Sequence, residues 1–296
     1  MTRIGFIGTG LMGTKMVNCL IDAGHELTVN DVVREAAAEV CGRGAAWAAS
    51  PREVGEKTDI VFTSLPGPDE VESVFFGESR GVLAGLRPGS CYVDMSTNSP
   101  ALWRRIAAAC SERGIDALDC PVTGRAPDMT IMAGGDAAVL ARYRPLLEAM
   151  SKAVYHMGEA GMGMVTKGVH QYLLHGKFLL LAEVLLIGTK GGVDLRALTE
   201  LLSNVNAGRG MPWDTFEKTV FQGAWDRSGG GPGPVDRWVK DVGCAGETAR
   251  AQDIDMPILE VVEGLLHSAQ ARGRGEWVNF ATVLELEERA GTELRT

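Results

Sequence analysis

The chain opens with a short apolar run that leads directly into a glycine-rich turn and then into a helical pattern. The first letters, "RIGFIGTG", have the pattern of a strand that ends in glycines, and "LMGTKMVNCLIDAG" has the apolar spacing of an amphipathic helix ending at a glycine. A second strand pattern, "HELTVND", follows. A strand, a glycine turn, a helix and a second strand within about 30 residues predict a βαβ unit with parallel strands.

The same alternation continues through the first half of the chain. Strand-length apolar runs are "DIVFTSLPG", "CYVDMST" and "IDALDCPV", and helical patterns such as "ALWRRIAAACSERG" separate them, until the pattern ends near Tyr155. Strands that alternate with helices predict a parallel sheet covered on both faces.

The second half has the sequence pattern of a helical domain. Helical patterns cover 165–191, 195–204, 212–221, 235–253 and 257–271, and "RSGGGPGP" is a loop among them. We therefore predict an α/β domain over residues 1–160 and an all-α domain over residues 161–296, with a long helix at the junction. A length of 296 residues agrees with two domains.

Composition argues against several classes of partner. A net charge of −9 argues against nucleic acid, and no apolar run is long enough to span a membrane; the longest is interrupted by Glu183. The six cysteines and five histidines are scattered without metal-site spacing. The first strand pattern starts without a charged leader. We expect no metal, and we interpret the cysteines as reduced core residues of a cytoplasmic protein.

The glycine turn carries the first functional motif. Letters 8–13, "GTGLMG", fit G-x-G-x-x-G between a strand and a helix, and Asp31 ends the second strand 21 residues after Gly10. Such glycines let a pyrophosphate approach the helix N-terminus, and the acid accepts hydrogen bonds from a ribose. The alternative is a βαβ unit without a ligand. The predicted cofactor-binding residues of this unit are Gly8, Gly10, Leu11, Met12, Gly13 and Asp31.

Asp31 also favours NAD as the cofactor, because its negative charge would oppose a 2′-phosphate. Arg34 lies three residues further and would partly offset that charge, so NADP stays open. The alternative for Arg34 is an ordinary solvated charge on a helix.

A polar stripe opens the first helix of the second half. In "GMGMVTKGVHQ", the residues Lys167, His170 and Gln171 share one helical face. A buried lysine is costly without a partner or a use. One use is proton transfer, because a lysine in a partly dry site has a lowered pKa and can act as a general acid and base. The alternative is a lysine whose stem is buried and whose ammonium reaches the surface.

Taken together and in order, the motifs resemble those of the β-hydroxyacid dehydrogenase family, which includes 3-hydroxyisobutyrate dehydrogenase and tartronate semialdehyde reductase. The resemblance covers nearly the whole length. It rests on "GFIGTGLMGTKM", "SLPGPDEV", "DMSTNSP", "DCPVTGR", "GMGMVTKGVHQ" and "VKD".

The resemblance implies a Rossmann-type NAD-binding domain and a helical domain for substrate binding and assembly, joined by a long helix, with the active site in the cleft. It implies an NAD-dependent 3-hydroxyacid dehydrogenase or semialdehyde reductase that forms a homodimer or homotetramer through the helical domain. Lys167 falls on the family's catalytic lysine. Further residues that the resemblance implies are Leu65, Pro66, Thr97 and Lys240 at the cofactor, and Thr123, Gly124, Arg125, His170 and Gln171 at the substrate, with Thr123 and Gln171 also counted as catalytic.

Four substitutions depart from the family pattern. His170 and Gln171 replace two asparagines; Gln171 keeps an amide, and His170 is either a packing residue or a second acid–base group. Thr123 replaces a serine and keeps its hydroxyl. Arg125 replaces a glycine in a shortened loop, where it either clamps a substrate anion or points to solvent. We expect a small anionic substrate.

Two alternative functions stay open at this point. An imine reductase has a similar scaffold but usually lacks the lysine, so Lys167 counts against it. A non-catalytic nucleotide-binding protein is disfavoured because Thr123, Lys167 and Lys240 are all retained.

Overall fold

The computed structural model describes residues 2–205, 218–225, 234–236, 238–239, 242, 249–250, 253–291 and 293–295. The chain divides into two compact units, Met1–Tyr172 and Leu173–Thr296. This division falls within a long helix, α7 (Met162–Lys190). The predicted domain boundary at residues 160 and 161 remains a prediction.

The first unit contains a nine-stranded sheet in the order β3-β2-β1-β4-β5-β6-β8-β7, with β9 beside β8. The strands are β1 (Ile4–Ile7), β2 (Leu27–Asn30), β3 (Ala46–Trp47), β4 (Ile60–Thr63), β5 (Cys91–Asp94), β6 (Asp116–Asp119), β7 (Val122–Thr123), β8 (Met129–Gly134) and β9 (Ser151–Gly158). The pairs from β3 through β6 are all parallel, which confirms the predicted α/β class.

The sheet departs from the predicted parallel pattern beyond β6. Strand β8 is antiparallel to both β6 and β7, whereas β9 is parallel to β8. The turn between β7 and β8 spans only residues 124–128, and a connection this short can join only antiparallel strands.

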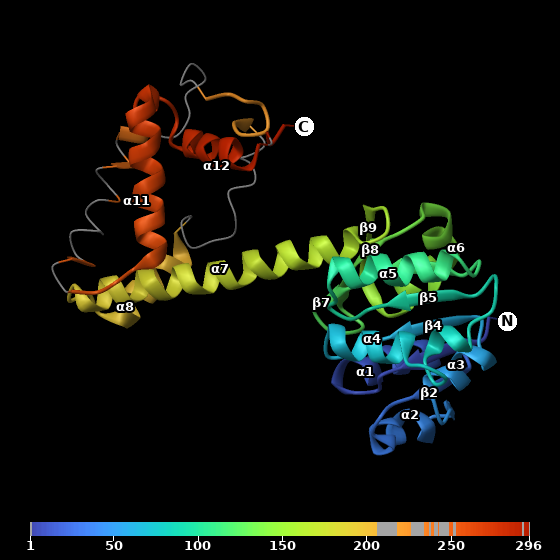
Figure 1. The fold of residues 1–296 in the computed structure, drawn as a ribbon. Helices are drawn as coiled ribbons and strands as arrows, with labels where there is room; N and C mark the ends of the chain where they lie inside the picture. The colour runs from blue at the N-terminus through green and yellow to red at the C-terminus, as the bar shows by residue number, and fades with distance from the viewer. Residues whose placement is uncertain are drawn as a thin grey trace. The chain divides into compact units, whose positions relative to one another are not determined.

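Helices cover both faces of the sheet, as predicted (Figure 1). Neighbouring strand residues point to opposite faces, so Ile4 and Phe6 of β1 join one buried cluster and Ile7 joins the other. The first cluster also takes side chains from α1, α2 and α6, and the second from α3, α4 and α5. These helices are α1 (Leu11–Asp22), α2 (Ala38–Gly42), α3 (Pro51–Lys57), α4 (Pro68–Phe76), α5 (Pro100–Ser111) and α6 (Ala137–Ala149).

The described part of the second unit is helical. It contains α8 (Leu195–Asn204), α11 (Pro257–Ala269), a π-helical turn (Gln270–Arg274), a 3-10 turn (Asn279–Thr282) and α12 (Val283–Ala290). The helices predicted at 195–204 and 257–271 are confirmed; those at 212–221 and 235–253 fall largely outside the described residues. A small core joins Val235, Leu266, Ala269 and Ala281. In the portion of the chain that is described, every helix is too short or too polar to cross a membrane. Assembly through the helical part remains a prediction.

Candidate functional site

The segments that follow four parallel strands lie side by side at one edge of the sheet. The backbone N–H of Ser64 donates to Ile7 at 3.0 Å, and that of Met95 donates to Thr63 at 2.9 Å. The N–H of Cys120 donates to the Asp94 carbonyl at 2.7 Å. The carboxyl ends of β1, β4, β5 and β6 are therefore hydrogen-bonded to one another, and ligands of open α/β sheets bind at this kind of edge.

The glycine turn after β1 has no room for side chains at two of its three glycines. Gly8 has a φ of +93°, and a Cβ on it would lie 2.3 Å from the carbonyl oxygen of Ser64. A Cβ on Gly13 would lie 1.8 Å from the carbonyl oxygen of Gly8, whereas a Cβ on Gly10 would meet nothing within 4 Å. Gly10 precedes α1 without a side-chain cap. The helix thus starts beside open space, which suits an anion.

Asp31 is held at the end of β2 by backbone donors. Its carboxylate accepts the Thr9 N–H at 2.7 Å and the Val33 N–H at 2.9 Å. A carboxylate offers about four acceptor positions, so capacity remains for ribose hydroxyls. The guanidinium of Arg34 lies 5.7 Å from the centre of the Trp47 ring, in a cation–π contact.

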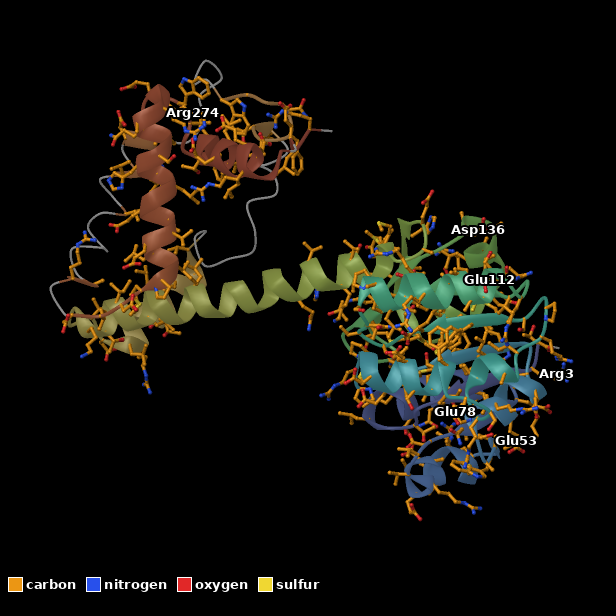
Figure 2. The ribbon with its side chains drawn as sticks, in the orientation of Figure 1. Arg3, Glu53, Glu78, Glu112, Asp136 and Arg274 are labelled. Carbon is orange, nitrogen blue, oxygen red and sulfur yellow. The ribbon has the colours of Figure 1, made fainter. Side chains whose placement is uncertain are left out.

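A cavity of about 1140 Å³ extends from this turn. Its charged lining is mostly acidic, with Glu78, labelled in Figure 2, following α4. Eight of the predicted cofactor-binding residues line it: Gly8, Gly10, Leu11, Met12, Gly13, Asp31, Leu65 and Pro66. The glycine cradle, the open helix start and the carboxylate together fit a dinucleotide.

A buried carboxylate orders the segment after β5, which contains the predicted residue Thr97. Asp94 is fully buried and accepts the Ser96 N–H at 3.0 Å and the Thr63 hydroxyl at 2.9 Å. The amide of Asn98 donates to the same carboxylate at 3.3 Å. Burial raises the pKa of Asp94 above its usual value, although these donors oppose the rise. Thr97 itself is exposed, between two anchored neighbours.

The lysine predicted to be catalytic is buried near the start of α7. Lys167 is 6% exposed, and burial lowers the pKa of its ammonium group. No neighbouring charge within the described residues contributes to that shift. The lowered pKa makes the neutral amine easier to form, which favours a general acid–base role for this lysine.

The other predicted substrate residues occupy two places in the first unit. His170 and Gln171 are half-buried on α7, and the His170 Nδ1 lies 3.3 Å from the Gln171 Oε1. Thr123 pairs with Thr130 in the β7–β8 hairpin. Two further residues are exposed in the turn of that hairpin: Gly124, with a φ of +83°, and Arg125.

Three buried polar residues of this edge were not predicted: Asp94, Ser96 and Asp119. The Ser96 hydroxyl accepts the Leu65 N–H at 2.9 Å, and Asp119 accepts backbone N–H groups from the start of α7. The sequence signal that was available is an acid as the last residue of an apolar strand, in "CYVD" and "DALD". The predicted residue Lys240 lies outside the described residues.

Comparisons with known proteins agree with this geometry. A family model described as the NAD binding domain of 6-phosphogluconate dehydrogenase matches residues 3–158, and one described as the NAD-binding of NADP-dependent 3-hydroxyisobutyrate dehydrogenase matches residues 161–286. The chain is 34% identical to probable 3-hydroxyisobutyrate dehydrogenase-like 1, mitochondrial, of Arabidopsis thaliana, over 97% of this chain and 85% of that protein.

Two further proteins extend the comparison. NAD-dependent L-serine dehydrogenase of Pseudomonas aeruginosa is 33% identical, over 97% of this chain and 98% of that protein. The solved imine reductase from Myxococcus stipitatus in complex with NADP+ is similar with a TM-score of 0.84 and 19% identity, over 96% of this chain and 99% of that chain. This last likeness shows the fold alone. The matched NAD-binding domains show that the cofactor is NAD(P).

Proposed function

Because the chain belongs to the β-hydroxyacid dehydrogenase family, whose members use NAD(P), we propose that it transfers a hydride between NAD(H) and a short β-hydroxy acid or its semialdehyde. The observation that carries this proposal is Lys167, a buried lysine whose pKa is lowered by burial. The resemblance of its segment to the family's motif supports the role of catalytic lysine for it. L-Serine and 3-hydroxyisobutyrate, named for the relatives, are both short 3-hydroxy acids.

The bound nicotinamide supplies the hydride acceptor or donor, and the protein moves the proton. In oxidation, neutral Lys167 accepts the proton of the substrate hydroxyl at its Nζ atom. In reduction, the ammonium form returns a proton to the developing alkoxide oxygen. The hydroxyl of Thr123 and the amide of Gln171 orient the reacting oxygen by hydrogen bonds. The N–H groups at the start of α1 would hold the pyrophosphate of the cofactor.

Oxidation or formation of NADH, followed by absorbance, tests the proposed function. The panel contains L-serine, 3-hydroxyisobutyrate, their semialdehydes, neutral short aldehydes and cyclic imines. We expect turnover with the hydroxy acids or semialdehydes. Turnover of imines alone would replace the proposal with imine reduction, and no turnover with any member, despite NADH binding, would favour a non-catalytic nucleotide-binding protein.

Cofactor choice gives the first prediction. We expect NADH to bind more tightly than NADPH, because the Asp31 carboxylate lines a cavity whose charged residues are mostly acidic. Asp69, Glu70 and Glu78 outnumber the two arginines of the lining, Arg34 and Arg80. Asp31→Ala should weaken NADH binding by about 1–3 kcal/mol through lost charge-assisted hydrogen bonds. Titration calorimetry measures the affinities for NADH and NADPH and the effect of Asp31→Ala on NADH binding. The control is Asp22→Ala, an exposed acid at the end of α1. Tighter binding of NADPH by the wild-type protein would contradict this role of Asp31.

Substrate charge gives the second prediction. We propose that Arg125 binds the substrate anion, because its guanidinium is exposed in the β7–β8 turn directly after Thr123 and Gly124. Arg125→Ala should raise KM about 10–100-fold without changing NADH affinity, and Arg125→Lys should recover part of the loss.

Steady-state kinetics with a matched acid and its methyl ester test this role directly. The wild-type protein should prefer the acid, and Arg125→Ala should lose that preference. Arg43→Ala, which removes an exposed arginine paired with Asp22, is the control and should leave KM unchanged. Equal kcat/KM for acid and ester in the wild-type protein would contradict an anion clamp.

A further inference from the structure

A fully buried carboxylate connects the sheet to the first turn of α7. Asp119, the last residue of β6, accepts the Gly161 N–H at its Oδ1 and the Met164 N–H at its Oδ2, both at 2.8 Å. The first N–H groups of a helix have no acceptor within the helix, and a negative charge there complements the helix dipole. Asp119 therefore caps α7 from a strand more than 40 residues earlier in the sequence.

Two glycines permit this close approach. A Cβ on Gly134 of β8 would lie 2.4 Å from the Asp119 Oδ1. A Cβ on Gly163 of α7 would lie 2.8 Å from the Asp119 Oδ2 and 2.4 Å from the carbonyl oxygen of Met132. The start of α7 thus packs against the ends of β6 and β8 with no space for even a methyl group, which fixes the position of the helix.

This contact lies next to the proposed catalytic lysine along the same helix. Lys167 follows Met164 by three residues, a rise of about 4.5 Å along the axis. A helix is stiff over such a distance, so the place of its first turn determines where the lysine side chain begins. Burial raises the pKa of Asp119 to about 6 even though the donated N–H groups oppose the rise, and the carboxylate form still predominates at pH 7.

We propose that Asp119 is a positioning residue that acts through Lys167: by holding the first turn of α7 on the sheet, it places the lysine Nζ for proton transfer. This inference rests on the proposed role of Lys167. It assigns to Asp119 an effect on turnover that a helix cap elsewhere in the protein would not have.

A second helix-capping aspartate, on a helix without a proposed catalytic residue, serves as the matched control for Asp119. Asp136, labelled in Figure 2, caps α6 by accepting the N–H groups of Ala138 and Val139 at 2.7 and 3.0 Å. No predicted catalytic residue lies on α6. Asp136→Asn and Asp119→Asn therefore make the same chemical change at two helix starts, and only the second should affect the reaction.

The test is a double-mutant cycle between positions 119 and 167, measured as kcat with NADH and the best substrate of the panel. Asp119→Asn keeps one carbonyl acceptor but turns an amide NH₂ toward the second N–H donor. It should lower kcat about 10–100-fold, since a misplacement of about 1 Å can cost 10²-fold, and leave the Kd of NADH within about twofold. In the Lys167→Ala background, the same change should cause no further loss. Asp136→Asn should leave kcat unchanged.

The outcomes separate the inference from the proposed function. A normal kcat in Asp119→Asn, or a loss of the same size with and without Lys167, would overturn the positioning role while Lys167 keeps its own. A normal kcat in Lys167→Ala would overturn the proposed role of Lys167, and the role of Asp119 with it. The proposed function itself would be overturned only by the substrate panel, if the wild-type protein turns over none of the hydroxy acids or semialdehydes. If Asp119→Asn does not fold, Gly163→Ala strains the same contact from the helix side and carries the same expectation.

Discussion

Replacing Lys167 by alanine is expected to lower kcat by about 10²–10⁴-fold, the usual contribution of a general acid–base group. NADH affinity should stay unchanged, because Lys167 is not among the residues that line the cofactor cavity. Lys167→Arg should fail as well, since a guanidinium does not release its proton near neutral pH. Single-turnover absorbance kinetics and calorimetry measure the two quantities. Near-normal turnover in Lys167→Ala would remove the lysine from the mechanism.

The lowered pKa of Lys167 also fixes the direction of the pH dependence. Reduction needs the ammonium form, so its kcat should fall as the pH rises through the lowered pKa. Oxidation needs the neutral amine, so its kcat should rise over the same interval. Because the folded protein holds this proton less tightly than the unfolded chain, stability should also rise with pH between the folded and unfolded pKa values.

A stability measurement separates a functional lysine from a structural one. Lys167 is nearly buried, and burial alone accounts for its shifted pKa within the described residues. Lys167→Met keeps the unbranched shape and removes the cost of burying the charge. Lys167→Met should therefore lose turnover to the same extent as Lys167→Ala, yet unfold at the wild-type temperature or above it. A lower melting temperature for Lys167→Met would indicate that the ammonium group has a stabilising partner.

The nucleotide-binding turn is predictable from the sequence because its determinants are local. The strand, the three glycines and the helix are consecutive, and Asp31 follows at a fixed offset. The structure adds a physical reason for two of the glycines: Gly8 has a positive φ, and Gly13 lies so close to a backbone carbonyl that a Cβ would not fit. Gly10 borders open space, so only a bound ligand would need a glycine there. The position of helices on both faces of the sheet is likewise predictable, because strands that are apolar throughout must be buried on both faces.

The contacts that order the rest of the site are not predictable in the same way. Asp119 and Gly161 are separated by 42 residues, and nothing in either local pattern states that one caps the other. The hairpin of β7 and β8 escapes a periodicity analysis because β7 has only two residues. The polar stripe of the helix indicated Lys167 from the sequence itself, whereas Thr123 and Arg125 came from the family resemblance.

Gly13→Ala is expected to destabilise the protein strongly, and it tests the glycine turn most directly. A Cβ at this position would lie 1.8 Å from the carbonyl oxygen of Gly8 and 2.9 Å from its carbonyl carbon. Both are backbone atoms, so no side-chain rotation can relieve the overlap. Overpacking of this kind usually costs about 1–3 kcal/mol and can cost more, and here α1 must move away from β1. Thermal and urea unfolding should show the loss in the absence of cofactor.

Gly10→Ala is the matched variant, because a Cβ there meets no protein atom within 4 Å. Gly10 has an extended backbone with φ near −70°, which alanine adopts without strain, so stability should stay within about 1 kcal/mol of wild type. The new methyl group nevertheless projects beside the start of α1, where the pyrophosphate should bind. NADH should therefore raise the melting temperature of the wild-type protein but not that of Gly10→Ala. Wild-type stability in Gly13→Ala would refute the close packing of the turn, and normal NADH binding by Gly10→Ala would refute its role as the cofactor cradle.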